Sequence, residues 1–352
     1  MTSRQFVQEK AMLGDYLMQY GISGDAAFHI LAFHYASCYA DRVSKIPTVI
    51  IRRWELDHNR IEQNSMLLQV LDTIVADDPM GGKLPEWYQF FIGRRFREGS
   101  GKFFTPKPIA RAMAQMLPII DQAVIMDPSC GGGTFLVEVS NVWRSHECSL
   151  LANDIEPSLV DLATITMILG ANQHHLKCFS TDNIFDDSKT VSSWSGKVDY
   201  ILANPPFSIR VDLEQRDSKL YSKGYKNSDA VFIDTALKLL KPGGRLVCLL
   251  PHSLVANSDF TDFRKIVEEF WHILAIICLP EGVFQLSAGT TTRADIVILE
   301  KKKYIGVKKN ADIIFASVPS VGIRLNNNDK TDVSNDLEKL MNDSAIRSAL
   351  QI

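Results

Sequence analysis

The chain has 352 residues, of which 46% are hydrophobic and 22% charged, and its formal net charge is −3 at pH 7. These values are typical of a globular protein with one large or two ordinary domains, and they exclude a surface coated in positive potential. No apolar run is long enough to span a membrane and residues 1–10 lack the form of a signal peptide, so we expect a cytoplasmic protein without membrane contact.

Apolar residues at three- and four-residue spacing predict helices over residues 6–20, 26–39, 61–75 and 84–96. We predict that residues 1–98 form a helical N-terminal domain without chemistry of its own. His29 and His34 lie near one helical face, and we interpret them as structural because no third ligand follows at a useful spacing. The six cysteines are far apart and form no CxxC pair, so no metal site and no disulfide framework is predicted.

A glycine-rich loop marks the start of a catalytic domain that we predict over residues 99–303. A Gly-aromatic-Pro loop at 101–108 precedes a helix over 109–117, and an apolar strand over 123–126 then leads into DPSCGGG at 127–133. Residues 134–143 continue as a helix. A glycine loop between a strand and a helix lets a ligand approach the backbone and directs N–H groups at it. This stretch therefore indicates a ligand site.

The next strands also end in acidic residues. A strand over 149–152 leads to Asp154, about twenty residues after the glycines, where an acid can hold ribose hydroxyls. A helix over 157–170 follows, and a third strand over 176–179 leads to Asp182. Acids at the carboxyl ends of successive strands favour a nucleoside site over simple helix caps. The pattern GxxxxGK[ST] is missing, which excludes a phosphate-binding P-loop.

The fourth predicted strand, over 198–203, delivers a stiff polar loop. It stops in Asn204-Pro205-Pro206-Phe207, where the prolines fix φ and remove backbone donors. The Asn204 side chain and the proline carbonyls can therefore converge as acceptors on an amino group. Phe207 offers a flat face on which a ring can stack.

The remainder of the chain continues the alternation of helices and strands. Residues 208–228 are polar and charged without periodicity, and both a solvated connection and a lid over an anionic polymer account for them. The expected elements beyond are a helix over 229–240, a turn at 241–244, a strand over 245–250, a helix over 260–270, strands over 272–279 and 294–300, a strand-like run at 312–318 and a helix around residue 337.

Over residues 98–303 these motifs resemble those of S-adenosylmethionine-dependent N6-adenine DNA methyltransferases, in particular the modification-subunit family of type I restriction-modification systems. The NPPF sequence at 204–207 matches the family's (N/D)PP(Y/F) motif. The segment 127–136 is similar to its glycine-rich cofactor motif, and residues 101–106 to its FxxP-like loop. The motifs also occur in the family's gamma-type order, which chance produces far more rarely than any single motif.

The resemblance implies an α/β fold: a Rossmann-like class I methyltransferase sheet, mostly parallel and seven-stranded, that binds S-adenosyl-L-methionine and needs no metal. Residues 104–106 would line the methionine moiety of the cofactor, and Asp127, Gly131 and Gly133 would hold its amino acid end and sulfonium region. The implied cofactor-binding residues are Phe104, Thr105, Pro106, Asp127, Pro128, Gly131, Gly133, Phe135, Asp154, Ile155, Asp182, Asn183 and Ile184.

The nucleoside end of the cofactor is assigned by the same resemblance. Asp154 would bind the ribose hydroxyls. Asp182 would accept a hydrogen bond from the exocyclic amine of the cofactor's adenine, with Ile155 and either Ile184 or Phe185 enclosing that ring.

The implied catalytic residues are Asn204, Pro205, Pro206 and Phe207. The Asn204 side chain and the Pro205 carbonyl would accept hydrogen bonds from the target amine, which favours a pyramidal nitrogen with its lone pair directed at the methyl group. A base inside a duplex must be rotated out, at a cost of about a few kcal/mol. Stacking on Phe207, worth about 1–3 kcal/mol, would help to offset that cost.

The expected partners follow from one feature of standalone adenine methyltransferases that this chain lacks, a sequence-reading domain. About fifty residues follow the last strands, which is too few for a sequence-reading domain. We therefore expect double-stranded DNA as substrate and a separate specificity subunit and an endonuclease subunit as partners. Either the N-terminal helices or residues 304–352, a C-terminal extension, would be the docking surface. Two alternatives stay open: methylation of RNA or of a protein glutamine, and an inactive cofactor-binding subunit.

Overall fold

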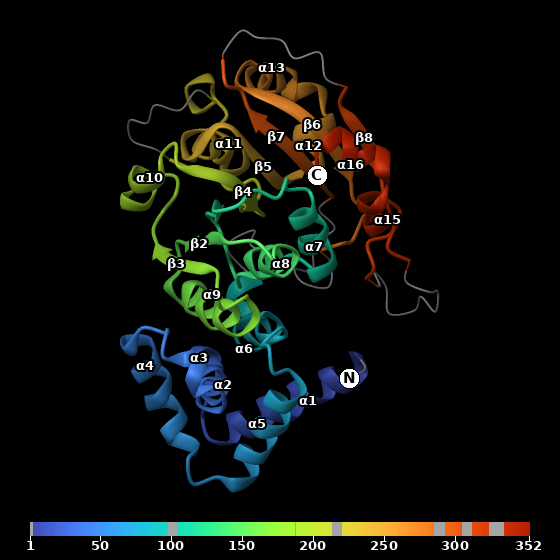
Figure 1. Cartoon of the computed structure of the whole chain (residues 1–352). Coiled ribbons are helices and arrows are strands. Elements are labelled where there is room, and N and C mark those ends of the chain that lie inside the picture. The colour runs from blue at the N-terminus through green and yellow to red at the C-terminus, as the bar shows by residue number, and fades with distance from the viewer. Residues whose placement is uncertain are drawn as a thin grey trace.

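Helices occupy the N-terminal part of the chain, and an open sheet with helices on both faces occupies the rest (Figure 1). The computed structural model describes residues 3–97, 104–186, 188–212, 220–284, 293–304, 312–323 and 334–352. Within these ranges no helix is long and apolar enough to cross a membrane.

The N-terminal helices confirm most of the periodicity. They are α1 (Ser3–Gln19), α2 (Gly24–Cys38), α3 (Ala40–Val43), α4 (Thr48–His58), α5 (Ser65–Asp77) and α6 (Leu84–Arg97). Helix α4 was not predicted, because Trp54 is its one buried residue and leaves no apolar stripe. Helix α5 begins later than predicted, because the Asn64 side chain accepts a hydrogen bond from the Leu67 N–H at 3.0 Å and caps it there.

The N-terminal helices share a hydrophobic core with α9 (Pro157–Gly170) from the following part of the chain. Trp87 and Tyr88 of α6 are fully buried in this core together with Leu162 and Ile165 of α9. All residues of α9 from Leu159 onward are buried. Figure 1 shows α6 and α9 between the N-terminal helices and the sheet. The helical segment therefore packs directly against the sheet-bearing part.

Over the described residues the sheet has eight strands in the order β3-β2-β1-β4-β5-β7-β6-β8. They are β1 (Ala123–Asp127), β2 (Cys148–Asp154), β3 (Leu176–Thr181), β4 (Val198–Ala203), β5 (Leu240–Pro251), β6 (Trp271–Cys278), β7 (Ala294–Lys301) and β8 (Ile314–Ser317). Only β7 runs antiparallel to its neighbours, so the prediction of a mostly parallel sheet is confirmed. The predicted count of seven strands is wrong by one, because the run near residue 314 pairs with β6 and extends the edge.

Successive residues of the central strands point to opposite cores, as expected for strands covered on both faces. In β1, Ile125 belongs to one core and Met126 to the other. The helices of the first face are α7 (Lys107–Gln115), α8 (Thr134–Val142), α15 (Asp336–Asn342), α16 (Ser344–Leu350) and one side of α9. The helices of the second face are α10 (Lys189–Trp194), α11 (Ser228–Leu239), α12 (His252–Ala256) and α13 (Thr261–Phe270).

The predicted turn at 241–244 lies inside β5 as a bulge. Leu240 pairs with Val198 and Arg245 with Tyr200, so the residues between them have one partner position on β4. Gly243 adopts a φ of +81°, which a glycine tolerates without strain. The chain turns at 241–244 and then resumes its pairing with β4. The predicted turn is therefore present, but it interrupts a strand instead of preceding one.

Candidate active site

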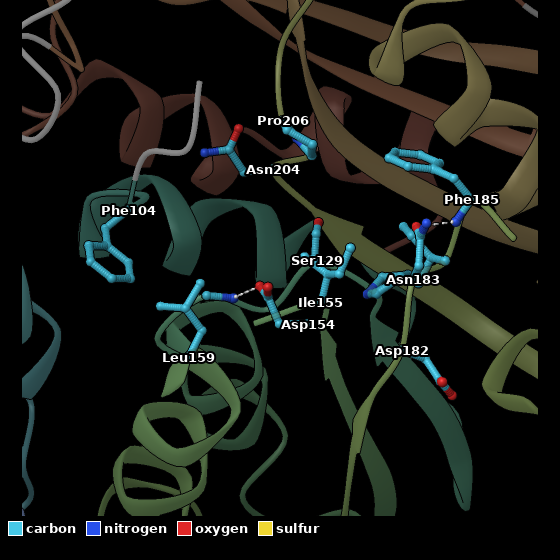
Figure 2. A pocket seen from close by; sticks show the side chains of 13 residues that line it. Phe104, Ser129, Asp154, Ile155, Leu159, Asp182, Asn183, Phe185, Asn204 and Pro206 are labelled. Atoms are coloured by element: carbon cyan, nitrogen blue, oxygen red, sulfur yellow. Dashed lines mark hydrogen bonds between the residues drawn. The ribbon is translucent and has the colours of Figure 1, made fainter. Parts of the chain in front are cut away.

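The first four strands run parallel, so their carboxyl ends meet at one edge of the sheet. The loops that follow them enclose an open cavity with about 630 Å³ of space including its mouth (Figure 2). Its lining residues are Phe104, Pro128, Ser129, Gly131, Asp154, Ile155, Leu159, Asp182, Asn183, Ile184, Phe185, Asn204 and Pro206. Most of these were predicted as site residues, so the topology brings together groups that are distant in sequence.

The glycine loop is bent by residues with positive φ. Gly131 has a φ of +49° and Gly133, the N-cap of α8, a φ of +77°. A Cβ on Gly133 would lie 3.2 Å from the Met167 side chain and 3.3 Å from Ala163 of α9. The loop therefore needs glycine at position 133 both for its backbone conformation and for the close approach of α9.

Asp154 at the end of β2 is held by backbone N–H groups. Its Oδ2 accepts a hydrogen bond from Gly131 N at 3.0 Å, and its Oδ1 accepts one from Glu156 N at 3.1 Å. Figure 2 shows its carboxylate within the cavity, beside the glycine loop. Two carboxylate oxygens offer about four acceptor positions, so hydroxyl groups can bond to the same carboxylate.

Asp127 at the end of β1 lies behind the cavity wall and is 1% exposed. Its Oδ1 accepts a hydrogen bond from Ser129 N at 3.1 Å, and its Oδ2 has no hydrogen-bond partner among the residues that the structure describes. Burial holds the pKa of Asp127 well above its usual range, and the negative charge of Asp154 adds to this. A donor on a ligand, such as an ammonium group, would satisfy this buried oxygen.

The loop after β3 contributes the apolar side chains of Ile184 and Phe185 to the cavity, and its Asp182 carboxylate is directed away from Asn204. Asp182 Oδ2 accepts hydrogen bonds from the Thr190 N–H at 3.0 Å and from the Thr190 hydroxyl. Figure 2 shows its carboxylate at the far side of the cavity from Asn204. Asn183 Oδ1 accepts from the Phe185 N–H at 3.0 Å. On the facing loop, Ile155 directly follows β2 and keeps 52% of its surface exposed. The predicted bond between Asp182 and the cofactor's exocyclic amine stays a prediction.

The loop after β4 is anchored at both ends. Asn204 Nδ2 donates to Thr105 Oγ1 at 3.2 Å, which orients the amide. The Pro206 carbonyl accepts from the Ser228 hydroxyl at the start of α11, and Ser228 Oγ also accepts from Ile209 N at 3.2 Å. Figure 2 shows Asn204 and Pro206 together at one side of the cavity. The amide is thus presented toward the cavity by a rigid loop.

The other predicted site residues do not line this cavity; they are Thr105, Pro106, Asp127, Gly133, Phe135, Pro205 and Phe207. Thr105 and Pro106 line a neighbouring cavity, while Phe135 is buried in the core. Phe207 is 7% exposed and packs edge-to-face on Phe284 with ring centroids 6.4 Å apart. Its predicted stacking on a target ring therefore stays a prediction.

Some contributors were missed by sequence reasoning. Ser129 lies inside the predicted glycine loop, but nothing in the sequence distinguished it from its neighbours. Leu159 lines the cavity because α9 packs behind the loop. Ser228 reaches Pro206 across 22 positions, a contact that no local pattern reveals.

The chain matches a known family and known structures. Residues 82–345 match the sequence profile of the family described as N-6 DNA Methylase. A protein of Listeria monocytogenes assigned to the class I S-adenosylmethionine-dependent methyltransferases superposes with a TM-score of 0.65 at 20% identity, over 99% of this chain and 100% of that one. This likeness shows that the fold is that of class I S-adenosylmethionine-dependent methyltransferases, as predicted.

Curated relatives match at lower coverage. The chain is 25% identical over 240 residues to the type I restriction enzyme MjaVII methylase subunit of Methanocaldococcus jannaschii, covering 63% of this chain and 40% of that protein. It is 25% identical over 277 residues to the type I restriction enzyme EcoEI methylase subunit of Escherichia coli, covering 74% and 52%. The chain thus spans about half the length of the curated relatives it matches.

Proposed function

The chain belongs to the N-6 DNA methylase family, and on that premise we propose that it transfers a methyl group from S-adenosyl-L-methionine to N6 of an adenine that is rotated out of DNA. The observation that carries this proposal is the Asn204 amide, which Thr105 orients at the rim of the cavity that Asp154 also lines. A hydrogen-bond acceptor for an amine and a carboxylate for a ribose lie in one cavity, beside a glycine loop.

The residues of the cavity fit the proposed cofactor. The bend at Gly131 and Gly133 opens the backbone to a ligand, and a Cβ at Gly131 would already lie 3.4 Å from the Phe104 ring. Asp154 has acceptor positions for the ribose hydroxyls. The exposed Ile155 side chain offers an apolar surface for a flat ring. Asp127 lies behind the cavity wall, so its predicted contact with the ammonium end of the cofactor stays a prediction.

The chemistry follows from the acceptors. When bound, the cofactor supplies an electrophilic methyl group on a sulfonium. The lone pair of an adenine amine is delocalised into the ring, which makes the amine a poor nucleophile. The Asn204 and Pro205 carbonyls would accept hydrogen bonds from the two N–H groups of the target amine. These bonds would hold its nitrogen pyramidal and stabilise the positive charge that develops on it. Positioning of the amine supplies most of the acceleration, so no metal is required.

The partners are proposed from the relatives. Proteins named as type I methylase subunits match this chain, so we propose duplex DNA as substrate and a specificity subunit and an endonuclease subunit as partners. We retain the division into a helical domain (1–98), a catalytic domain (99–303) and a docking extension (304–352). In the extension, α15 and α16 cover the first face of the sheet and are accessible on their outer side.

The test is transfer of labelled methyl groups to duplex DNA, RNA and protein in competition, followed by identification of the methylated base. The purified chain is assayed alone and with a specificity subunit encoded beside it. We expect N6-methyladenine in DNA. Preferential labelling of RNA or of a protein glutamine would replace this proposal with that alternative.

Two substitutions separate chemistry from cofactor binding. Asn204→Ala should lower transfer at least about a hundredfold, the effect of removing a transition-state hydrogen bond, while leaving cofactor affinity unchanged. Asp154→Ala should weaken cofactor affinity first, measured by calorimetry. Asn59→Ala is the matched control, since Asn59 is exposed at the end of α4 in the N-terminal helices. Full transfer activity in Asn204→Ala would contradict the mechanism.

A further inference from the structure

Three neighbouring strands bring a histidine, a cysteine and an aspartate together where β5 and β6 end and β7 begins. Asp295 lies near the start of β7, opposite Cys278 of β6 and Leu250 of β5. His252 begins α12 directly after β5. The ligand atoms of these three side chains all lie within 4.8 Å of one another, and His252 Nδ1 is 2.8 Å from Asp295 Oδ2. We propose that His252, Cys278 and Asp295 form a binding site for a zinc ion or a divalent cation of similar softness.

The buried carboxylate of Asp295 is the strongest indication. Its side chain is fully buried, at 0% exposure. Its Oδ2 contacts His252, whereas its Oδ1 is buried and accepts no hydrogen bond from an N–H or O–H group of the described residues, the Cys278 thiol being the neighbouring donor. A buried charge is strongly unfavourable unless it is paired and hydrogen-bonded or coordinates a metal. A cation at this position would satisfy Asp295 together with the neighbouring thiol.

The ligand set suits zinc. Zinc binds cysteine sulfur at about 2.3 Å and histidine nitrogen or carboxylate oxygen at about 2.0–2.2 Å, usually with tetrahedral geometry. Such bonds put the ligand atoms about 3.3–3.7 Å apart, so the His252–Asp295 contact would open by about half an ångström. Three protein ligands leave one position for water. The His252 side chain is 32% exposed, so an ion can enter from solvent.

The thiol fits this role as well. Burial, the charge of Asp295 and the hydrogen bond to Asp295 raise the pKa of Cys278, while the charge of Arg293 acts in the opposite direction, so a cation has to displace the thiol proton. A coordinating cation deprotonates its thiol ligand outright. Binding would therefore convert Cys278 into the thiolate that a zinc site contains, and it would link β5, β6 and β7 at their common edge.

A second group of the same residue types provides an internal comparison. His34, Cys38 and Asp72 of the N-terminal helices also lie within 4.8 Å of one another. There, however, Cys38 is exposed and the Asp72 side chain keeps 65% of its surface exposed, so water can solvate the carboxylate. The Asp72 carboxylate is therefore not a buried oxygen that requires a cation, unlike that of Asp295.

The experiment is a titration of the full-length, reduced and metal-free chain with Co²⁺, followed by displacement with Zn²⁺. A Co²⁺ ion bound by a thiolate in tetrahedral geometry gives a sulfur-to-metal charge-transfer band and strong visible bands. We expect one equivalent to give both, and Zn²⁺ to remove them. Absence of the charge-transfer band at one equivalent would overturn the proposal.

Matched cysteine variants assign the site. Cys278→Ser should abolish the charge-transfer band, whereas Cys38→Ser should leave it unchanged; the opposite pattern would overturn the proposal. His252→Gln should weaken Zn²⁺ binding by more than about tenfold, since loss of even an outer partner costs about 10–100-fold. Circular dichroism confirms folding of each variant. Asp295→Asn changes a buried group and that variant can fail to fold. The variants of Cys278 and His252, which are both partly exposed, then decide the outcome.

Discussion

Thr105 shows how a single hydroxyl can orient the Asn204 side-chain amide, which we propose as a catalytic hydrogen-bond acceptor. It was predicted to line the methionine moiety, but the structure places its Oγ1 3.2 Å from the Asn204 amide nitrogen. Thr105 is 8% exposed, so little water competes for this contact. The side-chain amide of an asparagine can rotate about its Cβ–Cγ bond unless a partner holds one end. Here Thr105 holds the nitrogen end. Thr105 is therefore a positioning residue for Asn204.

Replacing that hydroxyl should affect turnover more than binding. We expect Thr105→Val to lower kcat about 10–100-fold, because loss of a partner for a largely buried group costs about 1–3 kcal/mol. Thr105→Ser retains the hydroxyl and should restore most of the rate. Single-turnover kinetics with saturating cofactor and DNA measure this. Equal loss in the serine and valine variants would show that Thr105 acts through packing instead.

Helix α4 illustrates packing that periodicity does not reveal. Its last residue, His58, stacks on His34 of α2 with ring centroids 5.6 Å apart, and the facing nitrogens lie 3.3 Å apart. Burial and the neighbouring His34 lower the pKa of His58 to about 4. The contact joins α4 to α2, so we expect the packing of α4 to depend on pH through His58.

The sign of that dependence follows from proton uptake. Between its ordinary pKa of about 6.5 and its folded value of about 4, His58 takes up a proton more readily in the unfolded chain. Its contribution is present above pH 6.5 and is lost as the pH falls through this window. Thermal melting at pH 7.5 and 5.0 should show a fall in Tm that His58→Gln reduces by about 2 °C, allowing for solvent screening. An equal fall in both proteins would contradict this.

At the scale of the whole molecule, the helical segment and the sheet depend on each other. Leu159, Leu162, Ile165, Ile168 and Leu169 of α9 are buried against the N-terminal helices. Burial of one such side chain contributes about 1.5–3 kcal/mol, so these five contribute about 8–15 kcal/mol. That is comparable to the stability of an entire domain, about 5–15 kcal/mol. The helical segment and the sheet-bearing part therefore share one hydrophobic core through α9.

Deletion of residues 1–98 tests this dependence. The remaining chain should aggregate, or bind a hydrophobic dye with loss of its cooperative thermal transition, because α9 becomes exposed on one side. Co-expression of residues 1–98 as a separate fragment should restore solubility. A soluble truncated chain with a sharp melting transition would show that the helical segment is dispensable for folding.

Local patterns revealed the elements that carry the site, because each depends on nearby residues. The strand before DPSCGGG, the acid after β2 and the NPPF loop all follow from apolar runs interrupted by glycine, proline or acid. Parallel topology then required that these ends meet. By contrast, Thr105 bonds to Asn204 across 99 positions, and Phe207 is packed against Phe284. No local pattern contains such contacts.

What the sequence by itself determined is the class I fold, the order of its motifs and the residues at the carboxyl ends of the first four strands, because alternation and turn chemistry are local. Only the tertiary structure decided the orientation of the Asn204 amide and the direction of the Asp182 carboxylate. It also decided the pairing of the run near residue 314 with β6 as an eighth strand, and the meeting of His252, Cys278 and Asp295. The reason is physical: side-chain direction depends on partners that distant segments supply, and those partners exist only once the sheet has assembled.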